Sequence, residues 1–256
     1  MLIFPGTRIM AAFLQDLLAG PPVGRKWTSA GPCLADHGMV LASHPKLLGA
    51  YLGLGGAAIE HPIIEEVMEA CNTVNKCPYC DRLHGQMARI AGSACAGTTA
   101  PELYGKAFCG ADGQSDEAEK AAWATLVTGE GDARATSVKA LSTFLMWGSL
   151  TGNTVNGCKK KLVGLEAPAG LTAFELIYFC YYAPLFFVVY VVSLIVGFLP
   201  AMSSQAWFFK LMGSVLTFLS FIWILPLGLT GLILGTVIDL RGMGDGPGST
   251  SGGKKE

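Results

Sequence analysis

The sequence predicts an all-α protein in which a helical domain is followed by two apolar helices long enough to cross a membrane. Three observations support this fold class: apolar residues at helical spacing, no sustained strand alternation between hairpin turns, and two uncharged runs near the end of the chain. Of the 256 residues, 51% are hydrophobic and only 14% are charged. Average soluble domains contain about 25% charged residues, so this composition is atypical of a soluble enzyme and excludes a disordered chain.

Several segments of the first part carry the pattern of amphipathic helices. In 62–74, for example, apolar side chains share one face and three glutamates another. Gly92 suits the C-terminus of one helix, and Asp116 with Glu119 has the spacing of a capping box. The expected helices are 44–59, 62–74, 77–92, a helix that follows Asp116, and 135–150.

Two uncharged runs, 176–199 and 211–238, indicate a transmembrane hairpin within residues 171–240. Each run exceeds the roughly 20 residues that a helix needs to cross about 30 Å of hydrocarbon. Pro184 and Pro226 lie inside the runs and predict kinks, which membrane helices tolerate. The alternative is a buried core hairpin of a globular protein, which the length of both runs disfavours.

Basic residues predict the orientation of this hairpin. Lys159–Lys161 precede the first run and Arg241 follows the second, whereas the linker between them contains only Lys210. The positive-inside rule then places the helical domain and the tail on the cytoplasmic, matrix or stromal side. These compartments are reducing, so cysteines there should be free thiols or chemically active.

The two ends of the chain and its net charge complete the expected organisation. We expect residues 1–24 to form an N-terminal extension and the glycine-rich residues 241–256 to form a flexible tail. The formal net charge is −1, which supplies no basic field, so we expect no nucleic-acid partner.

Cys77, Cys80 and His84 form the most informative cluster. Their three- and four-residue spacing puts them on one face of a helix. We expect Asn75 to cap a helix that begins at about Lys76, so that both cysteines lie in its first turn. Unpaired N–H groups and the positive end of the helix dipole favour a thiolate there, and His84 can relay the thiol proton. The cluster therefore predicts redox-active dithiol chemistry.

This motif resembles that of the AhpD-like alkylhydroperoxidase and carboxymuconolactone decarboxylase superfamily. The family pattern is a glutamate, Cys-X-X-Cys twelve residues later, and a histidine; here these are Glu65, Cys77, Cys80 and His84. The resemblance implies that Cys80 attacks peroxide, that Cys77 resolves the product, and that Glu65 and His84 deprotonate the thiol. Some AhpD peroxidases have a second histidine between the cysteines, where this chain has Tyr79.

The resemblance covers residues 25–165 and implies an AhpD-like helical redox domain there, outside the apolar hairpin. The segment 135–162 is similar to the last core helix of the family. The family also implies a thiol reductant, either thioredoxin-like or lipoyl, and assembly of several chains through helical faces.

Other interpretations of the cysteines remain open. A structural zinc site needs four ligands, and the motif supplies three, so Cys71 or His61 would have to complete it. Haem attachment is excluded, because it requires a histidine directly after the second cysteine, where Asp81 stands. Two buried thiols without chemistry are a further alternative. We expect no metal and no cofactor, and we interpret the six remaining cysteines as small hydrophobic residues and His37 and His61 as loop residues.

The leading hypothesis is a membrane-anchored, thiol-dependent oxidoreductase that reduces hydroperoxides through a Cys-X-X-Cys dithiol/disulfide cycle. Its expected partners are a hydroperoxide substrate, a thiol reductant, membrane lipid, and either further copies of the chain or a membrane complex. The alternative is an accessory or structural subunit of a large membrane complex, in which the AhpD-like domain serves for docking. Decarboxylation of a lactone is a weaker option, because it gives Cys77 and Cys80 no role.

Overall fold

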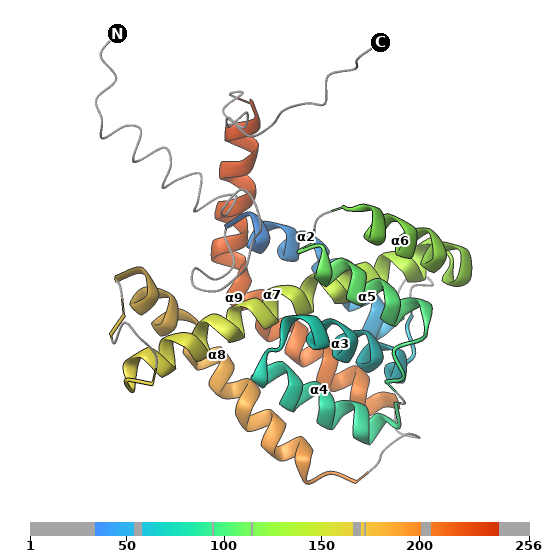
Figure 1. Cartoon of the computed structure of the whole chain (residues 1–256), viewed down its shortest axis with the longest axis horizontal. Helices are drawn as coiled ribbons and strands as arrows, with labels where there is room; N and C mark the ends of the chain where they lie inside the picture. The colour runs from blue at the N-terminus through green and yellow to red at the C-terminus, as the bar shows by residue number, and fades with distance from the viewer. Residues whose placement is uncertain are drawn as a thin grey trace.

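The computed structural model describes residues 34–53, 58–93, 95–113, 115–165, 170–171, 173–200 and 206–240. Over these ranges the protein is all-helical and contains no strand, which confirms the predicted fold class (Figure 1). The expected N-terminal extension 1–24 and tail 241–256 lie outside the described residues. The helices are α2 (Leu34–Leu52), α3 (His61–Asn75), α4 (Pro78–Ala91), α5 (Ala100–Gly110), α6 (Glu117–Glu130), α7 (Asp132–Leu162), α8 (Ala173–Gly197) and α9 (Ala206–Leu240).

Helix α7 is the centre of the bundle, and α2, α3, α4, α5, α6 and α8 all pack against it. In Figure 1 it crosses the molecule from the side of α6 to the side of α8. Its 31 residues extend well beyond the expected 135–150. The largest fully buried side chains of the core include Leu47, Tyr104, Phe108, Leu141 and Met146.

Helices α2 and α5 also differ from the sequence-based expectation. Helix α2 spans Leu34–Leu52 instead of 44–59, because Gly53 adopts a left-handed φ of 74° and ends it. His37 is therefore a buried helical residue and not part of a loop. Helix α5 was not expected, although Thr99 and Glu102 form a full capping box at its start.

Helix α4 begins later than predicted, so the expected cap at Asn75 is wrong. Asn75 is the last residue of α3, Lys76 takes a left-handed conformation with φ 53°, and Cys77 is the N-cap of α4. The physical reason is Pro78, which suits the first helical position because it has no N–H and disfavours helical geometry in the residue before it. Gly92 ends α4 with φ 71°, as expected.

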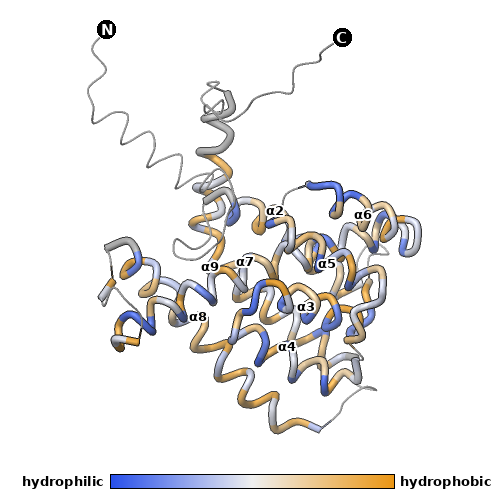
Figure 2. Tube along the Cα trace, viewed as in Figure 1, coloured by the Kyte–Doolittle hydropathy of each residue, from blue (hydrophilic) through white to orange (hydrophobic). Residues whose placement is uncertain are grey.

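Helices α8 and α9 are long and apolar enough to cross a membrane, over Glu175–Gly197 and Trp207–Ile233. Figure 2 shows both as largely orange and white along these stretches. Only 28% of the residues in the most apolar window of each helix are buried, so most residues there keep some exposed surface. Large side chains such as Phe187, Phe198 and Phe218 are exposed.

The two apolar helices are nevertheless walls of the same bundle. Helix α9 lies along α2, where a Cβ on Gly213 would overlap the ring of Tyr51 and a Cβ on Gly228 would meet Leu41 at 2.9 Å. Helix α8 packs on α4 and α7, and Arg89 donates a hydrogen bond of 3.0 Å to the carbonyl of Leu199. The structure thus joins the two apolar helices to the residues that the sequence analysis treated as a separate domain.

Candidate dithiol site

The turn between α3 and α4 fixes the first cysteine. The side-chain oxygen of Asn72 accepts a hydrogen bond from the backbone N–H of Cys77 at 3.0 Å. From α7, Asn153 donates to the carbonyl of Asn75 at 2.7 Å, which holds the end of α3 in place. Cys77 therefore has a defined backbone position at the N-terminus of α4.

The two cysteines lie in one helical turn. The backbone N–H of Cys80 donates to the Sγ of Cys77 at 3.3 Å, so the thiol of Cys77 is itself the helix cap. Cys77 is fully buried, and Cys80 is 6% exposed. Ser149 of α7 donates to the Sγ of Cys80 at 3.7 Å, so α7 contacts the second sulfur as well.

The surroundings shift the pKa values of the two thiols in opposite directions. A hydrogen bond from the thiol of Cys80 lowers the pKa of the Cys77 thiol most. Backbone N–H groups and the charge of His84 also lower it, and together these interactions outweigh burial. That same hydrogen bond, donated to Cys77, and burial raise the pKa of Cys80 well above its ordinary value. Of the two thiols, Cys77 therefore loses its proton more readily, and the Cys80 thiol is the donor that stabilises the resulting thiolate.

Glu65 and His84 contact each other, although they come from different helices. The Nδ1 of His84 lies 2.9 Å from the Oε2 of Glu65, and their side chains are 12% and 2% exposed. The other carboxylate oxygen lies 3.1 Å from the Nε2 of His61, at the start of α3. His61 thus joins the site, contrary to its interpretation as a loop residue.

Glu65 and His84 form a buried pair in which each side chain shifts the pKa of the other. Burial alone would lower the pKa of His84, but the charge and hydrogen bond of Glu65 outweigh it and raise that pKa. Burial would likewise raise the pKa of Glu65, but the charge of His84 and the contacts with both histidines lower it. The pair therefore favours the charged form of both side chains, and it lies one helical turn from the dithiol.

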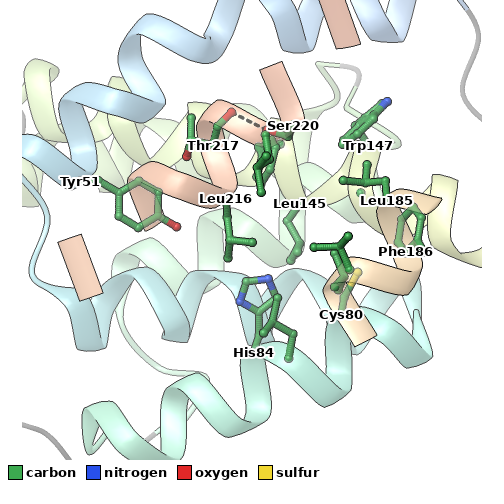
Figure 3. Close-up of a pocket in the computed structure, with 16 residues that line it drawn as sticks. Tyr51, Cys80, His84, Leu145, Trp147, Leu185, Phe186, Leu216, Thr217 and Ser220 are labelled. Atoms are coloured by element: carbon green, nitrogen blue, oxygen red, sulfur yellow. Dashed lines mark hydrogen bonds between the residues drawn. The ribbon is translucent and has the colours of Figure 1, made fainter. Parts of the chain in front are cut away.

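A narrow apolar cavity opens between the dithiol and the two apolar helices. Cys80 and His84 rise into it from α4, while Leu185 and Phe186 approach from α8 and Leu216 from α9 (Figure 3). Its volume is about 80 Å³. One water-sized group needs about 10–15 Å³ on this scale, so the cavity holds a short row of such groups. Cys77 does not line it.

The remaining described cysteines differ among themselves. Cys71 and Cys109 are buried together between α3 and α5, as small hydrophobic residues would be, and Cys158 is also buried. Cys95 and Cys180 are exposed, which their interpretation as packing residues did not foresee. Within the described residues, no group of three histidine, cysteine or acidic side chains has the arrangement of a metal site.

No protein-family model, no curated protein and no solved structure matches this chain. The resemblance to the AhpD-like superfamily therefore stays an expectation from the sequence spacing of Glu65, Cys77, Cys80 and His84.

Proposed function

We propose that the protein is a membrane-associated dithiol oxidoreductase of the AhpD-like type, and that it reduces hydroperoxides with an apolar tail. The observation that carries this proposal is the joint placement of a dithiol and an imidazole–carboxylate pair at an apolar cavity. The two sulfurs share one helical turn, and Cys80 and His84 both line the cavity.

The proposed reaction uses both thiols and the imidazolium. Cys80 attacks the peroxide; its sulfur bonds to one peroxide oxygen, the O–O bond breaks, and the alcohol leaves with a proton. The Cys77 thiolate then attacks the sulfenic acid of Cys80, and hydroxide leaves as water with the proton of His84. In sum, a thiol, a thiolate, an imidazolium and a hydroperoxide yield a disulfide, a neutral imidazole, an alcohol and water.

The assignment of the two sulfurs follows from access and charge together. Cys80 borders this apolar cavity and Cys77 does not, so an apolar substrate that enters it meets Cys80. The low pKa of Cys77 suits the second step, because a thiolate is the attacking form of a resolving cysteine. The peroxide step requires the Cys80 proton to move first; the Cys77 thiolate, which accepts the hydrogen bond of the Cys80 thiol, takes that proton and passes it to the leaving alkoxide.

The walls of the cavity support an apolar substrate. They come from Leu145 and Trp147 of α7 and from the apolar helices α8 and α9 (Figure 3). Because α8 and α9 also expose large apolar side chains outward, a lipid-derived hydroperoxide could reach Cys80 without crossing bulk water.

We further propose that α8 and α9 each cross the membrane, with Lys159–Lys161 and Arg241 on the cytoplasmic, matrix or stromal side. An impermeant maleimide applied to sealed vesicles tests this topology. In a background without Cys95 and Cys180, a cysteine placed by Lys159→Cys and one placed by Ser203→Cys should be labelled from opposite sides. Labelling of both from one side would exclude the two crossings.

The test of the activity is turnover of cumene hydroperoxide by the full chain in detergent, with a dithiol as reductant. We expect Cys80→Ser to abolish turnover and Cys95→Ser to leave it unchanged, because Cys95 is an exposed thiol outside the site. Peptide mass analysis after one equivalent of peroxide should find a Cys77–Cys80 disulfide. Full turnover by Cys80→Ser would refute the proposal.

A further inference from the structure

The His84–Glu65 pair continues to a third titratable side chain. Glu65 presents one oxygen to His84 at 2.9 Å and the other to His61 at 3.1 Å. His61 precedes Glu65 by four residues in α3, so the two side chains lie on the same helix face. The buried carboxylate thus stands between two imidazoles, only one of which borders the cavity at Cys80.

His61 lines a second, larger cavity of about 310 Å³ that neither Cys80 nor His84 borders. Glu60 also lines this cavity and its side chain is 63% exposed, so the cavity reaches the surface. The volume is ample for several water molecules. Phe209 of α9 stacks on the imidazole with ring centroids 3.9 Å apart, which holds His61 between this cavity and Glu65.

The other ionisable groups around His61 are poor carriers of a proton near neutral pH. Burial, and secondly the charge of Glu65, raise the pKa of Tyr51 far above its ordinary value, so its phenol stays neutral. Glu60 is paired with Arg134 at 2.6 Å, and that hydrogen bond lowers the pKa of Glu60. Lys210 also lines this cavity, and Glu69 faces the opposite, His84 side.

We propose that His61 returns a proton to His84 through Glu65 after each oxidation of the dithiol, and draws that proton from the second cavity. This inference rests on the dithiol chemistry proposed above. Oxidation of Cys77 and Cys80 consumes the imidazolium proton and leaves Glu65 as a buried carboxylate without its cation, which is unfavourable. The oxidised site therefore takes up a proton. His61 is thus a positioning residue and not a catalytic one: it holds the incoming proton next to Glu65 and does not contact the sulfurs.

Proton uptake during a single oxidation tests this role. The reduced full chain is mixed in weak buffer with a pH-indicator dye and diamide, which accepts two electrons and two protons from the dithiol. The wild-type protein should take up a proton once the disulfide has formed. His61→Gln should slow that uptake by about tenfold or more. His44→Gln should not, because His44 is a buried histidine of α2 bonded to the Val40 carbonyl and has no contact with Glu65.

Two further variants separate proton exchange from a structural effect. In His61→Gly, added imidazole should restore the fast uptake through the second cavity, whereas thiazole, a ring of similar size with a far less basic nitrogen, should not. Ala58→Trp fills the same cavity from its exposed rim and should also slow the uptake. If His61→Gln fails to fold, the uptake measured in Ala58→Trp tests the proposal in its place.

Three results would overturn the proposal: unchanged uptake in His61→Gln, unchanged uptake in Ala58→Trp, or equal rescue by thiazole. Because diamide replaces the hydroperoxide, the outcome does not depend on whether the protein turns over peroxides. Loss of hydroperoxide turnover together with normal proton uptake would contradict the proposed function and leave this inference standing.

Discussion

The Sγ of Cys77 accepts the backbone N–H of Cys80 at 3.3 Å, so the first cysteine of the motif is the cap of its own helix. A thiolate is favoured at this position because the helix start offers unpaired N–H groups and a positive dipole end. The relationship separates the low-pKa sulfur, Cys77, from the sulfur that borders the cavity, Cys80. The two thiols therefore have different roles in the proposed cycle: Cys80 meets the peroxide, and Cys77 resolves the product.

The first prediction concerns the thiolate. The ultraviolet absorbance of the wild-type protein minus that of Cys77→Ser should titrate below the ordinary pH range of cysteine, because the pKa of Cys77 is lowered. Cys80→Ala removes the strongest of the lowering interactions, the hydrogen bond from the Cys80 thiol, and should move this titration to higher pH. Cys95→Ser is the control and should leave the difference curve in place. A low-pH titration that survives Cys77→Ser would assign the thiolate elsewhere.

The second prediction concerns the dependence of stability on pH. The pKa of Glu65 is below its ordinary value of 4.5, so its contribution is present above pH 4.5 and is lost as the pH falls through the lowered pKa. The pKa of His84 is above its ordinary value of 6.5, so its contribution is complete below pH 6.5 and is lost as the pH rises through the raised pKa. The pair therefore stabilises the fold most between these two values.

Thermal unfolding of the wild type and of Glu65→Gln across that range measures the effect. The difference in melting temperature should be largest between pH 4.5 and 6.5 and should shrink on both sides. Glu117→Gln is a suitable control, since Glu117 pairs with Lys120 on the surface and its side chain is 93% exposed. A difference that does not vary with pH would mean that Glu65 is not paired with a protonated His84.

The sequence predicts the local parts of this site and not the parts that depend on packing. Cys77, Cys80 and His84 follow from helical spacing, because one helix sets their relative positions. The contact between Glu65 and His84 joins two helices, and only the family spacing suggested it. His61 had a local signal, since it precedes Glu65 by four residues, but the expected helix began at Pro62 and left His61 in the preceding loop. Helix α3 instead begins one residue earlier, at His61 itself.

The apolar helices illustrate the same division. Their length and lack of charge predict helices of membrane type, and α8 and α9 have that character. Composition cannot tell which face of such a helix meets protein, so the cavity at Cys80 was not foreseen. The glycines of α9 offered a signal of close packing, and the structure uses Gly213 and Gly228 to receive α2 within the same chain.

The third prediction concerns the cavity. Val188 of α8 lines it and is 38% exposed, so Val188→Trp should block it from the rim. Oxidation of Cys80 by a fatty-acid hydroperoxide, and by a phospholipid hydroperoxide in vesicles, should slow much more than oxidation by hydrogen peroxide. Val191→Trp alters a valine of α8 with similar exposure, 36%, that does not line the cavity, and serves as the control. Equal slowing of all three peroxides would argue against substrate passage through this cavity.

The last prediction concerns two glycines one turn apart in α7. A Cβ on Gly152 would meet the Sγ of Cys77 at 2.7 Å and the ring of Phe186 at 2.8 Å, whereas a Cβ on Gly148 would meet nothing within 4 Å. Gly152→Ala should therefore destabilise the fold by about 1–3 kcal/mol through overpacking. Gly148→Ala should stabilise it by about 0.5–1 kcal/mol, because alanine is the better helix former. Denaturant unfolding measures both effects.

Displacement of the Cys77 sulfur in Gly152→Ala should also weaken its cap on α4 and raise the pH at which the thiolate forms. A Gly152→Ala protein as stable as Gly148→Ala, with an unshifted thiolate titration, would show that α7 does not press on Cys77.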